Sequence, residues 1–292
     1  MKKLLLSVIA VIVTVAALGT STFAWFTLSN KASVGDFNAQ VTSGEGIEIR
    51  IDGQNNWYTD IPASVMQDHI EAQKVKFKDL TSANGVDLKN FKGGAASVGS
   101  YYEVTLQFRA AQATNIYWVG TTLSGEGTLP TWQPDAKFSY RGVELTSESE
   151  EIYIDVSDAA RISVANGTNT YVYEKPGVTN GNTNMSGIVF SSATKLPTSG
   201  SVAYYNAKNV DDQIILETYK AVKLVDTFSS FDTSELTNNK KVVTLTGSGT
   251  TFTGKITVRV YLEGWDDDTF NSILGEKLFA SLRFEGVPVD QD

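Results

Sequence analysis

Cysteine is absent from the 292-residue chain, and His69 is its only histidine. Without cysteine there can be no disulfide, thiol nucleophile, thiolate zinc site or lipid anchor on a cysteine. A single histidine excludes zinc sites built from paired histidines and a catalytic triad with a second candidate base. Catalytic mechanisms that use a Ser/Lys pair, a Tyr/Glu pair or two carboxylates need neither cysteine nor a second histidine. The spacing of these residues in the sequence does not favour any one of the three. We therefore expect a protein that is not an enzyme and has no cofactor.

Basic residues are outnumbered, with 24 Lys and Arg against 33 Asp and Glu and a net charge of −9. Binding of nucleic acid depends on neutralising phosphates with Lys and Arg. The charge balance therefore argues against a nucleic-acid partner. It favours solubility in an extracellular matrix or wall environment, although an ordinary soluble surface explains it equally well.

The chain begins with two lysines, an apolar and small-residue run from Leu4 to Gly19, and a polar patch that ends at Ala24. This order of basic, apolar and small residues is typical of an export signal. Cleavage after Ala24 would leave Trp25 as the first residue of a 268-residue mature chain. The run is shorter than the roughly 20 residues of a spanning helix. We therefore expect a signal peptidase to remove residues 1–24; a retained membrane anchor is the alternative.

Alternation of apolar and polar residues with a period of two predicts half-buried strands. The clearest cases are Ile47–Ile51, Tyr101–Ala110 and Lys255–Glu263. Further strands are expected at Asn115–Thr122, Phe138–Leu145, Glu151–Val156, Arg161–Val164, Thr170–Tyr173, Asp212–Asp226, Lys240–Leu245 and Leu278–Phe284. The range Asp212–Asp226 is long enough for either one strand or a pair of strands.

Only two segments favour helices. Ile61–Lys78 carries Pro62 near its start and apolar residues near one face, and Asp266–Leu274 begins with acidic residues. Short strands at roughly ten-residue spacing indicate a sandwich. The expected fold is therefore an all-β sandwich with one or two short peripheral helices.

Three regions follow the export signal. Residues 25–41 form an irregular, aromatic-headed N-terminal arm, and residues 42–292 form the β-sandwich domain. Within that domain, residues 123–201 are rich in Gly, Thr, Ser and Asn, which predicts many loops. This middle part is either an insertion or a second sheet layer, and the pattern does not separate the two.

Two motifs resemble ligand sites. Gly249–Lys255 has the spacing of a phosphate-binding loop, but an alternating strand follows it where a helix should begin, so a hairpin loop is expected. Asp266, Asp267 and Asp268 could supply oxygen ligands to calcium. They lack the alternating acidic positions and the distant Glu of a loop-type calcium site. Capping of the short helix by Asp266 is the preferred interpretation.

Two stretches resemble a known family. The segment Gly19–Thr27 (GTSTFAWFT) resembles the signal-peptide end of the TasA/camelysin family, in which small residues precede Ala, two aromatics and a hydroxyl residue. The run Ile256–Phe284 is similar to the closing strand, Glu-Gly-Trp-Asp corner, short helix and final strand of exported proteins from Gram-positive bacteria with this signal type. Together the two stretches cover about 50 residues at the ends of the chain.

The resemblance implies a jelly-roll-like antiparallel sandwich that is secreted to the cell surface or biofilm matrix. It also implies a non-enzymatic homopolymer in which the N-terminal arm of one copy completes a sheet of the next. An open sheet edge offers backbone groups to such a strand. The residues expected to fill the acceptor groove are Trp25, Phe26, Leu28 and Phe37. Pairing of the arm within its own chain is the alternative, favoured from Val34 onward.

Other partners and functions remain possible from the sequence. Other matrix proteins or polysaccharide are further candidate partners. The alternative function is a monomeric, glycan-binding sandwich, which would use exposed aromatics such as Trp57, Tyr58, Trp118 and Trp132. A surface protease, as the camelysin resemblance implies, is disfavoured because its metal site would have to be built with one histidine.

Overall fold

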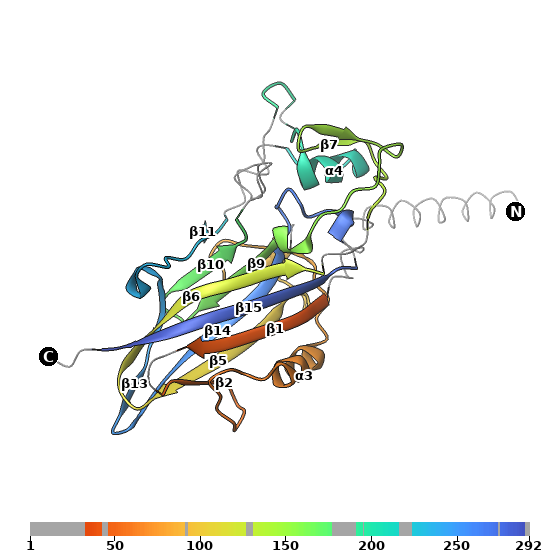
Figure 1. The fold of residues 1–292 in the computed structure, drawn as a ribbon. Coiled ribbons are helices and arrows are strands. Elements are labelled where there is room, and N and C mark those ends of the chain that lie inside the picture. Colours follow the sequence, from red (N-terminus) through yellow and green to blue (C-terminus); the bar gives the residue numbers. More distant parts are fainter. Residues whose placement is uncertain are drawn as a thin grey trace, which may run out of the picture.

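The structure is a computed structural model that describes residues 33–42, 46–90, 93–126, 131–176, 191–194, 196–215, 224–273 and 275–289. Within these ranges the chain is mostly β, with two short α-helices (Figure 1). The expected signal peptide, its cleavage site at Ala24 and Trp25, and the arm residues Phe26 and Leu28 lie outside the described residues.

A four-stranded sheet contains both the first and the last strand. Its order is β1-β15-β6-β12, from strands β1 (Ser33–Thr42), β15 (Lys277–Pro288), β6 (Thr114–Gly125) and β12 (Lys240–Thr244). Strand β1 runs parallel to β15, whereas the other two pairs are antiparallel.

A nine-stranded sheet is organised around β14 (Thr251–Glu263). Strand β14 pairs with β9 on one side and with β5 on the other. The remaining strands extend from these three. Besides β14, the sheet contains β2 (Glu48–Ile51), β3 (Asp79–Ser82), β4 (Leu88–Asn90), β5 (Tyr102–Ala110), β9 (Ala160–Ala165), β10 (Thr170–Glu174), β11 (Thr227–Phe228) and β13 (Thr246–Ser248).

Not all strand pairs are antiparallel. The pairs β1–β15, β10–β11 and β14–β3 are parallel, so the sheets are mixed and the expectation of a purely antiparallel arrangement is wrong at these three places. Two of the three pairs use strands of two or four residues beside longer ones. The third joins the two ends of the described chain.

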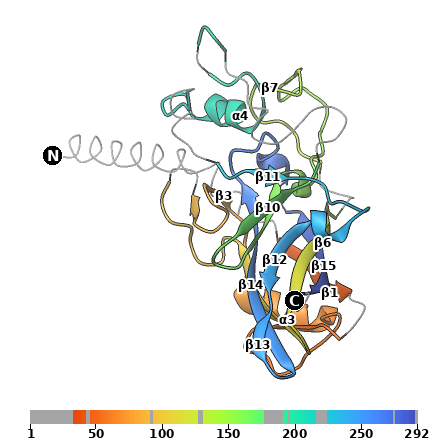
Figure 2. The same ribbon diagram turned by 90° about the vertical axis from the view of Figure 1, so that its left-hand side faces the viewer.

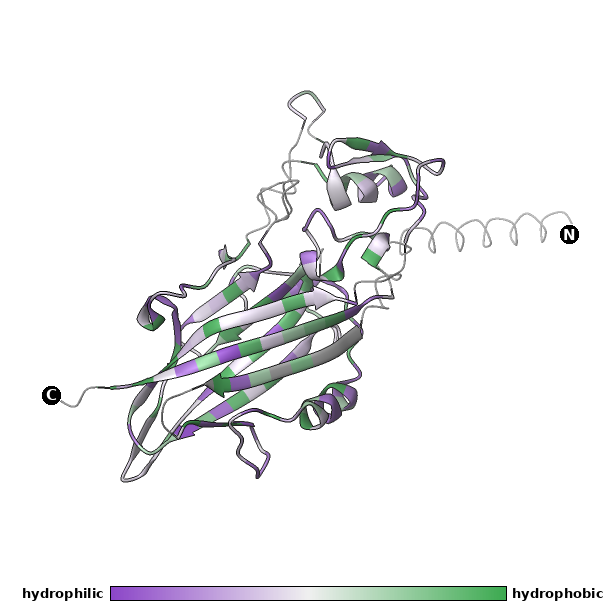
Figure 3. Ribbon diagram, in the orientation of Figure 1, coloured by the Kyte–Doolittle hydropathy of each residue, from purple (hydrophilic) through white to green (hydrophobic). Residues whose placement is uncertain are grey.

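The strongest sequence patterns became strands. Every second residue of β5 is buried, and along β14 the buried residues alternate from Ile256 to Val260, as expected for strands with one face in the core. Hydrophobic and hydrophilic residues alternate along strands of the sheets (Figure 3). The Gly249–Lys255 motif forms the turn and first residues of the β13–β14 hairpin, as expected. The predicted helix is confirmed as α3 (Ala63–Gln73), which buries Met66 and Ile70 and ends at Lys74 in a left-handed conformation.

Side chains from the two sheets share one hydrophobic core. Phe108 of β5 meets Phe284 of β15 edge to face, with their ring centroids 5.3 Å apart. Trp118 of β6 contacts Tyr173 of β10 and Phe228 of β11, at centroid distances of 6.1 and 5.2 Å. Large buried rings of this kind supply much of a core's apolar area.

A small cap lies at one end of both sheets (Figures 1 and 2). It contains the hairpin of β7 (Phe138–Tyr140) and β8 (Val143–Leu145), and helix α4 (Gly200–Lys208). Phe138, Trp132 and Tyr204 form an aromatic cluster with Phe270, which follows β14. The described part of residues 123–201 therefore divides among the end of β6, this cap, and strands β9 and β10 of the larger sheet.

Three predicted elements differ from the structure. Residues 212–215 and 224–226 of the expected strand at 212–226 are not strand, and residues 216–223 lie outside the described residues. Of Glu151–Val156, only Ile152 makes a bridge, to Trp132. The stretch after Asp266 forms turns and a three-residue 3-10 helix, Asn271–Ile273, so Asp266 caps no α-helix.

Candidate functional site

The N-terminal strand β1 lies at the edge of the four-stranded sheet. Its parallel ladder with β15 runs from Ser33 opposite Lys277 to Thr42 opposite Glu285. Alternate residues Phe37, Ala39 and Val41 point into the core and are buried. Hence β1 presents a regular row of apolar side chains to the rest of the molecule.

The outer edge of β1 is covered over only part of its length. The Val41 N–H donates to the Thr59 carbonyl at 2.9 Å, and the Ile61 N–H donates to the Ala39 carbonyl at 3.3 Å. Within the described residues, backbone hydrogen bonds on this side are confined to positions 39–41. Helix α3 packs beside the strand. Strand β1 therefore fills a groove between β15 on one side and residues 59–61 with α3 on the other.

The ring of Phe37 anchors β1 in this groove. It is 2% exposed and lies 5.2 Å from the ring of Tyr102 on β5 of the other sheet. Burying a Phe side chain contributes about 1.5–3 kcal/mol. An empty groove would expose Tyr102 and the backbone edge of β15, so the folded chain needs this or another strand there.

Of the four residues expected to mediate assembly, the structure describes only Phe37. It pairs within its own chain, which is the alternative favoured from Val34 onward, and Trp25, Phe26 and Leu28 lie outside the described residues. No sequence pattern indicated that the partner of β1 is the last strand of the chain.

A second cluster of functional groups lies where β14 ends, around the Glu-Gly-Trp-Asp corner. Arg161 of β9 is buried and contacts Asp266 at 2.5 Å and Glu174 of β10 at 3.2 Å. Its other guanidinium nitrogen donates to the Ala160 carbonyl at 3.0 Å. Glu263 of β14 is also buried and attracts Arg161, but it forms no ion pair with it.

Three buried carboxyl groups therefore surround one guanidinium. Burial in this poorly solvated position raises the pKa of Glu263 to about 8, and the attraction of Arg161 offsets this only in part. Glu263 accepts a hydrogen bond from the Trp265 N–H at 3.2 Å. At neutral pH we expect Glu263 to hold a proton. Burial also raises the pKa of Asp266, to about 7, although Arg161 attracts its charged form.

The three consecutive aspartates do not converge on a common point. Asp266 pairs with Arg161, whereas Asp268 pairs with Arg141 of the cap at 3.1 Å and accepts a hydrogen bond from the Tyr140 hydroxyl. Burial raises the pKa of Asp267 to about 7. In the part of the chain that the structure describes, no group of three or more His, Asp or Glu side chains is placed to hold a metal ion. The weak calcium prediction therefore gains no support.

The aromatics considered for glycan binding are mostly engaged in packing. Trp118 is completely buried, so the expectation that it is exposed is wrong. Trp132 packs in the cap against Tyr204. The ring of Trp57 lies over the guanidinium groups of Arg50 and Arg109, 4.3 and 4.5 Å from its centroid. Tyr58 is half-buried against the core, so none of the four candidates is fully exposed.

None of the helices in the described ranges is long and apolar enough to cross a membrane. Comparisons with protein-family models, with curated protein sequences and with solved structures find no match to this chain. The resemblance to the TasA/camelysin family therefore stays a prediction from the two quoted stretches.

Proposed function

We propose that this chain is a secreted, non-enzymatic structural protein of a bacterial cell surface or biofilm matrix that assembles with copies of itself. The supporting observation is the position of β1: it is the first strand of the described residues, it lies at a sheet edge, and it is held by its ladder with β15 and by two backbone hydrogen bonds to residues 59 and 61. No other described element precedes β1, so β1 could leave its groove without unthreading any of them.

Exchange of β1 between copies would preserve its contacts. In the single chain, Phe37, Ala39 and Val41 fill the groove of their own molecule; in the polymer the same side chains would fill the groove of the next one. The two states then differ little in buried area, as in other domain-swapped assemblies. Gly46 lies between β1 and β2 and has a φ of 62°, which glycine adopts without strain.

The rest of the proposal follows the sequence. Residues 1–24 would be the export signal, cut between Ala24 and Trp25, and the two sheets with their shared core would form a jelly-roll-like sandwich. Residues 25–41 would be the donor, with Trp25, Phe26 and Leu28 adding contacts ahead of β1. Matrix proteins or polysaccharide are possible additional partners.

A pair of introduced cysteines tests strand donation. Gln40 of β1 and Arg283 of β15 are opposite each other in the ladder and both are exposed, and the chain has no cysteine of its own. Directly opposed strand residues have the Cα separation that a disulfide needs. In Gln40→Cys/Arg283→Cys, oxidation of the monomer should lock β1 in place and abolish fibres, whereas oxidation after assembly should give a ladder of covalent multimers on a non-reducing gel.

The matched control is Thr122→Cys/Ser281→Cys. These residues are opposite each other on β6 and β15, and their hydroxyl groups are 2.5 Å apart. Because neither strand moves in the proposed exchange, this disulfide should stay within one chain in both experiments.

Electron microscopy of the chain beginning at Trp25, beside one beginning at Val34, shows whether fibres form and whether they need residues 25–33. If only single particles form at all pH values and concentrations, the proposal is contradicted and a monomeric glycan-binding protein is favoured. A Gln40→Cys/Arg283→Cys disulfide that stays intramolecular in fibres would contradict strand donation in the same way.

A further inference from the structure

A row of three lysines follows helix α3. Lys74 ends the helix with a φ of 50°, and the chain then runs extended to Lys78. Val75 and Phe77 are buried, whereas Lys74, Lys76 and Lys78 alternate with them on the outer side. Alternate residues of an extended segment share one face, so Lys76 and Lys78 are about 7 Å apart along the chain.

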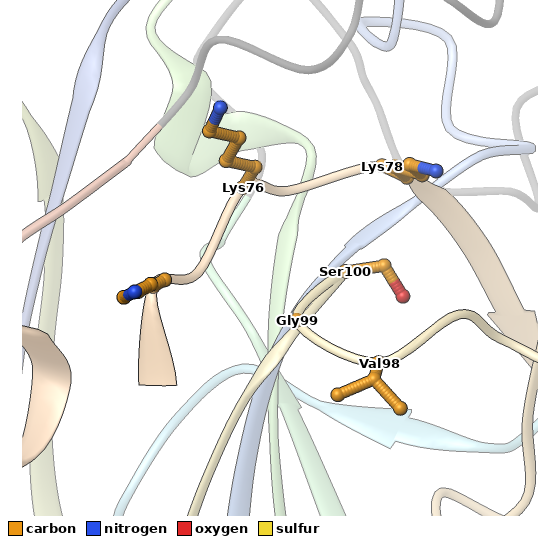
Figure 4. A pocket seen from close by; sticks show the side chains of 6 residues that line it. Lys76, Lys78, Val98, Gly99 and Ser100 are labelled. Carbon is orange, nitrogen blue, oxygen red and sulfur yellow. The ribbon is translucent and has the colours of Figure 1, made fainter. Parts of the chain in front are cut away.

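The three lysines line a hollow of about 330 Å³ (Figure 4). Val98, Gly99 and Ser100 form its other wall. The two walls are joined by backbone hydrogen bonds, from the Lys76 N–H to the Gly99 carbonyl at 2.7 Å and from the Lys78 N–H to the Ser100 carbonyl at 3.2 Å. The backbone beneath the lysines is therefore held in place, while their ammonium groups reach into solvent.

These lysines differ from most basic residues of the described chain in having no ion-pair partner. Ten Lys and Arg side chains form ion pairs elsewhere in the described ranges, including Lys137, Lys208 and Lys277 with carboxylates at 2.9 to 3.0 Å. Within the same ranges, no carboxylate lies within ion-pair distance of Lys74, Lys76 or Lys78. In a chain with an excess of acidic residues, three unpaired lysines in one hollow form a local site of opposite charge.

We propose that this lysine hollow binds a linear polyanion, a flexible polymer that carries phosphate or carboxylate groups. The side chains of Lys76 and Lys78 point in different directions from the hollow (Figure 4), so an extended chain of repeated anionic groups suits the site better than one small ion. Lysine acts as a point charge without the bidentate geometry of arginine, so the site selects for charge and spacing. No aromatic residue lines the hollow on which a base could stack, which disfavours single-stranded nucleic acid. The site goes beyond the proposed assembly and does not depend on it.

The test measures binding of fluorescently labelled inorganic polyphosphate and of poly-L-glutamate to the chain beginning at Trp25, with light scattering recorded on the same samples to separate binding from assembly. We expect binding in low salt that weakens steeply as the salt concentration rises, because counterions are released. Lys74→Gln/Lys76→Gln/Lys78→Gln should weaken it by at least about tenfold, as a loss of about 1.4 kcal/mol produces. Binding of polyphosphate alone, of polyglutamate alone or of both identifies the anionic group.

The control, Lys137→Gln/Lys208→Gln/Lys277→Gln, removes the same charge from lysines that are paired with carboxylates. It should retain nearly the affinity of the unmodified chain. Equal losses in the two triple variants would mean that only the overall charge matters, and failure of the unmodified chain to bind either polymer would equally overturn the proposal. Urea unfolding of both variants checks that neither set of exposed substitutions disturbs the fold.

Discussion

Replacing Arg161 by methionine is expected to lower the free energy of unfolding by about 3–5 kcal/mol, since it leaves buried carboxylates without their counter-charge. Asp266 and Glu174 both contact this guanidinium, and all three side chains are buried. Methionine retains most of the apolar stem of arginine but none of its charge. For a domain whose total stability is about 5–15 kcal/mol, such a loss is a large fraction.

Arg109→Met is the matched control for Arg161→Met. Arg109 contacts Glu48 at the same 2.5 Å, but both of those side chains are more than a third exposed. A solvent-exposed pair contributes about 0–1 kcal/mol. Urea unfolding of the two variants, followed by tryptophan fluorescence at pH 7, should therefore separate them clearly. Equal losses would show that burial does not set the strength of the Arg161 cluster.

The second large effect concerns the pH dependence of stability and its removal by Glu263→Gln. The pKa of Glu263 is raised from 4.5 to about 8 in the folded chain, mainly by burial. A carboxyl group with a raised pKa contributes stability that is fully present below pH 4.5 and is lost as the pH rises through about 8. The unmodified chain should therefore become less stable between pH 5 and pH 9.

Glutamine resembles the protonated acid and cannot ionise, so Glu263→Gln should differ little from the unmodified chain at pH 5. At pH 9 it should be more stable by about 3–5 kcal/mol, because each unit of pKa shift corresponds to about 1.4 kcal/mol. Asp267 and Glu276, whose pKa values burial raises to about 7 and about 6, titrate in both chains and cancel in the comparison. Burial also raises the pKa of Asp266 to about 7, and its repulsion of ionised Glu263 is part of the expected difference between the two chains.

The measurement is the free energy of unfolding in urea at pH 5, 7 and 9. Glu144→Gln provides the control, since the Glu144 side chain is 62% exposed beside Lys137 and should not change the pH dependence. Parallel pH profiles for Glu263→Gln and the unmodified chain would contradict the assignment of the buried proton to Glu263.

Elements with strong local patterns were predictable from the sequence. Strand β5 alternates over its whole length, and α3 carries its apolar residues near one face, so both were recognised. Helix α4 was not, because it follows a loop-like Ser199 and begins at Gly200, whose φ is 79°. The lysine row was assigned to the first helix, since Lys74 ends that helix without a glycine or proline to mark the place.

Contacts between distant residues could not be predicted from local pattern. The pairing of Phe37 with Ala280 and of Arg161 with Asp266 joins residues that are far apart in the sequence. The acidic run at 266–268 suggested metal binding or helix capping, because nothing in the sequence shows which basic residues face it. Periodicity reports which face of an element is buried but not what lies against that face.

The central position of β15 in the four-stranded sheet also sets the order of folding. Strand β15 lies between β1 and β6, so the sheet cannot close until Lys277–Pro288, near the end of the chain, has been synthesised. Such long-range pairing slows folding. Under the proposed export, this delay would keep the polypeptide extended during transport, and β1 would acquire its partner only when β15 arrives.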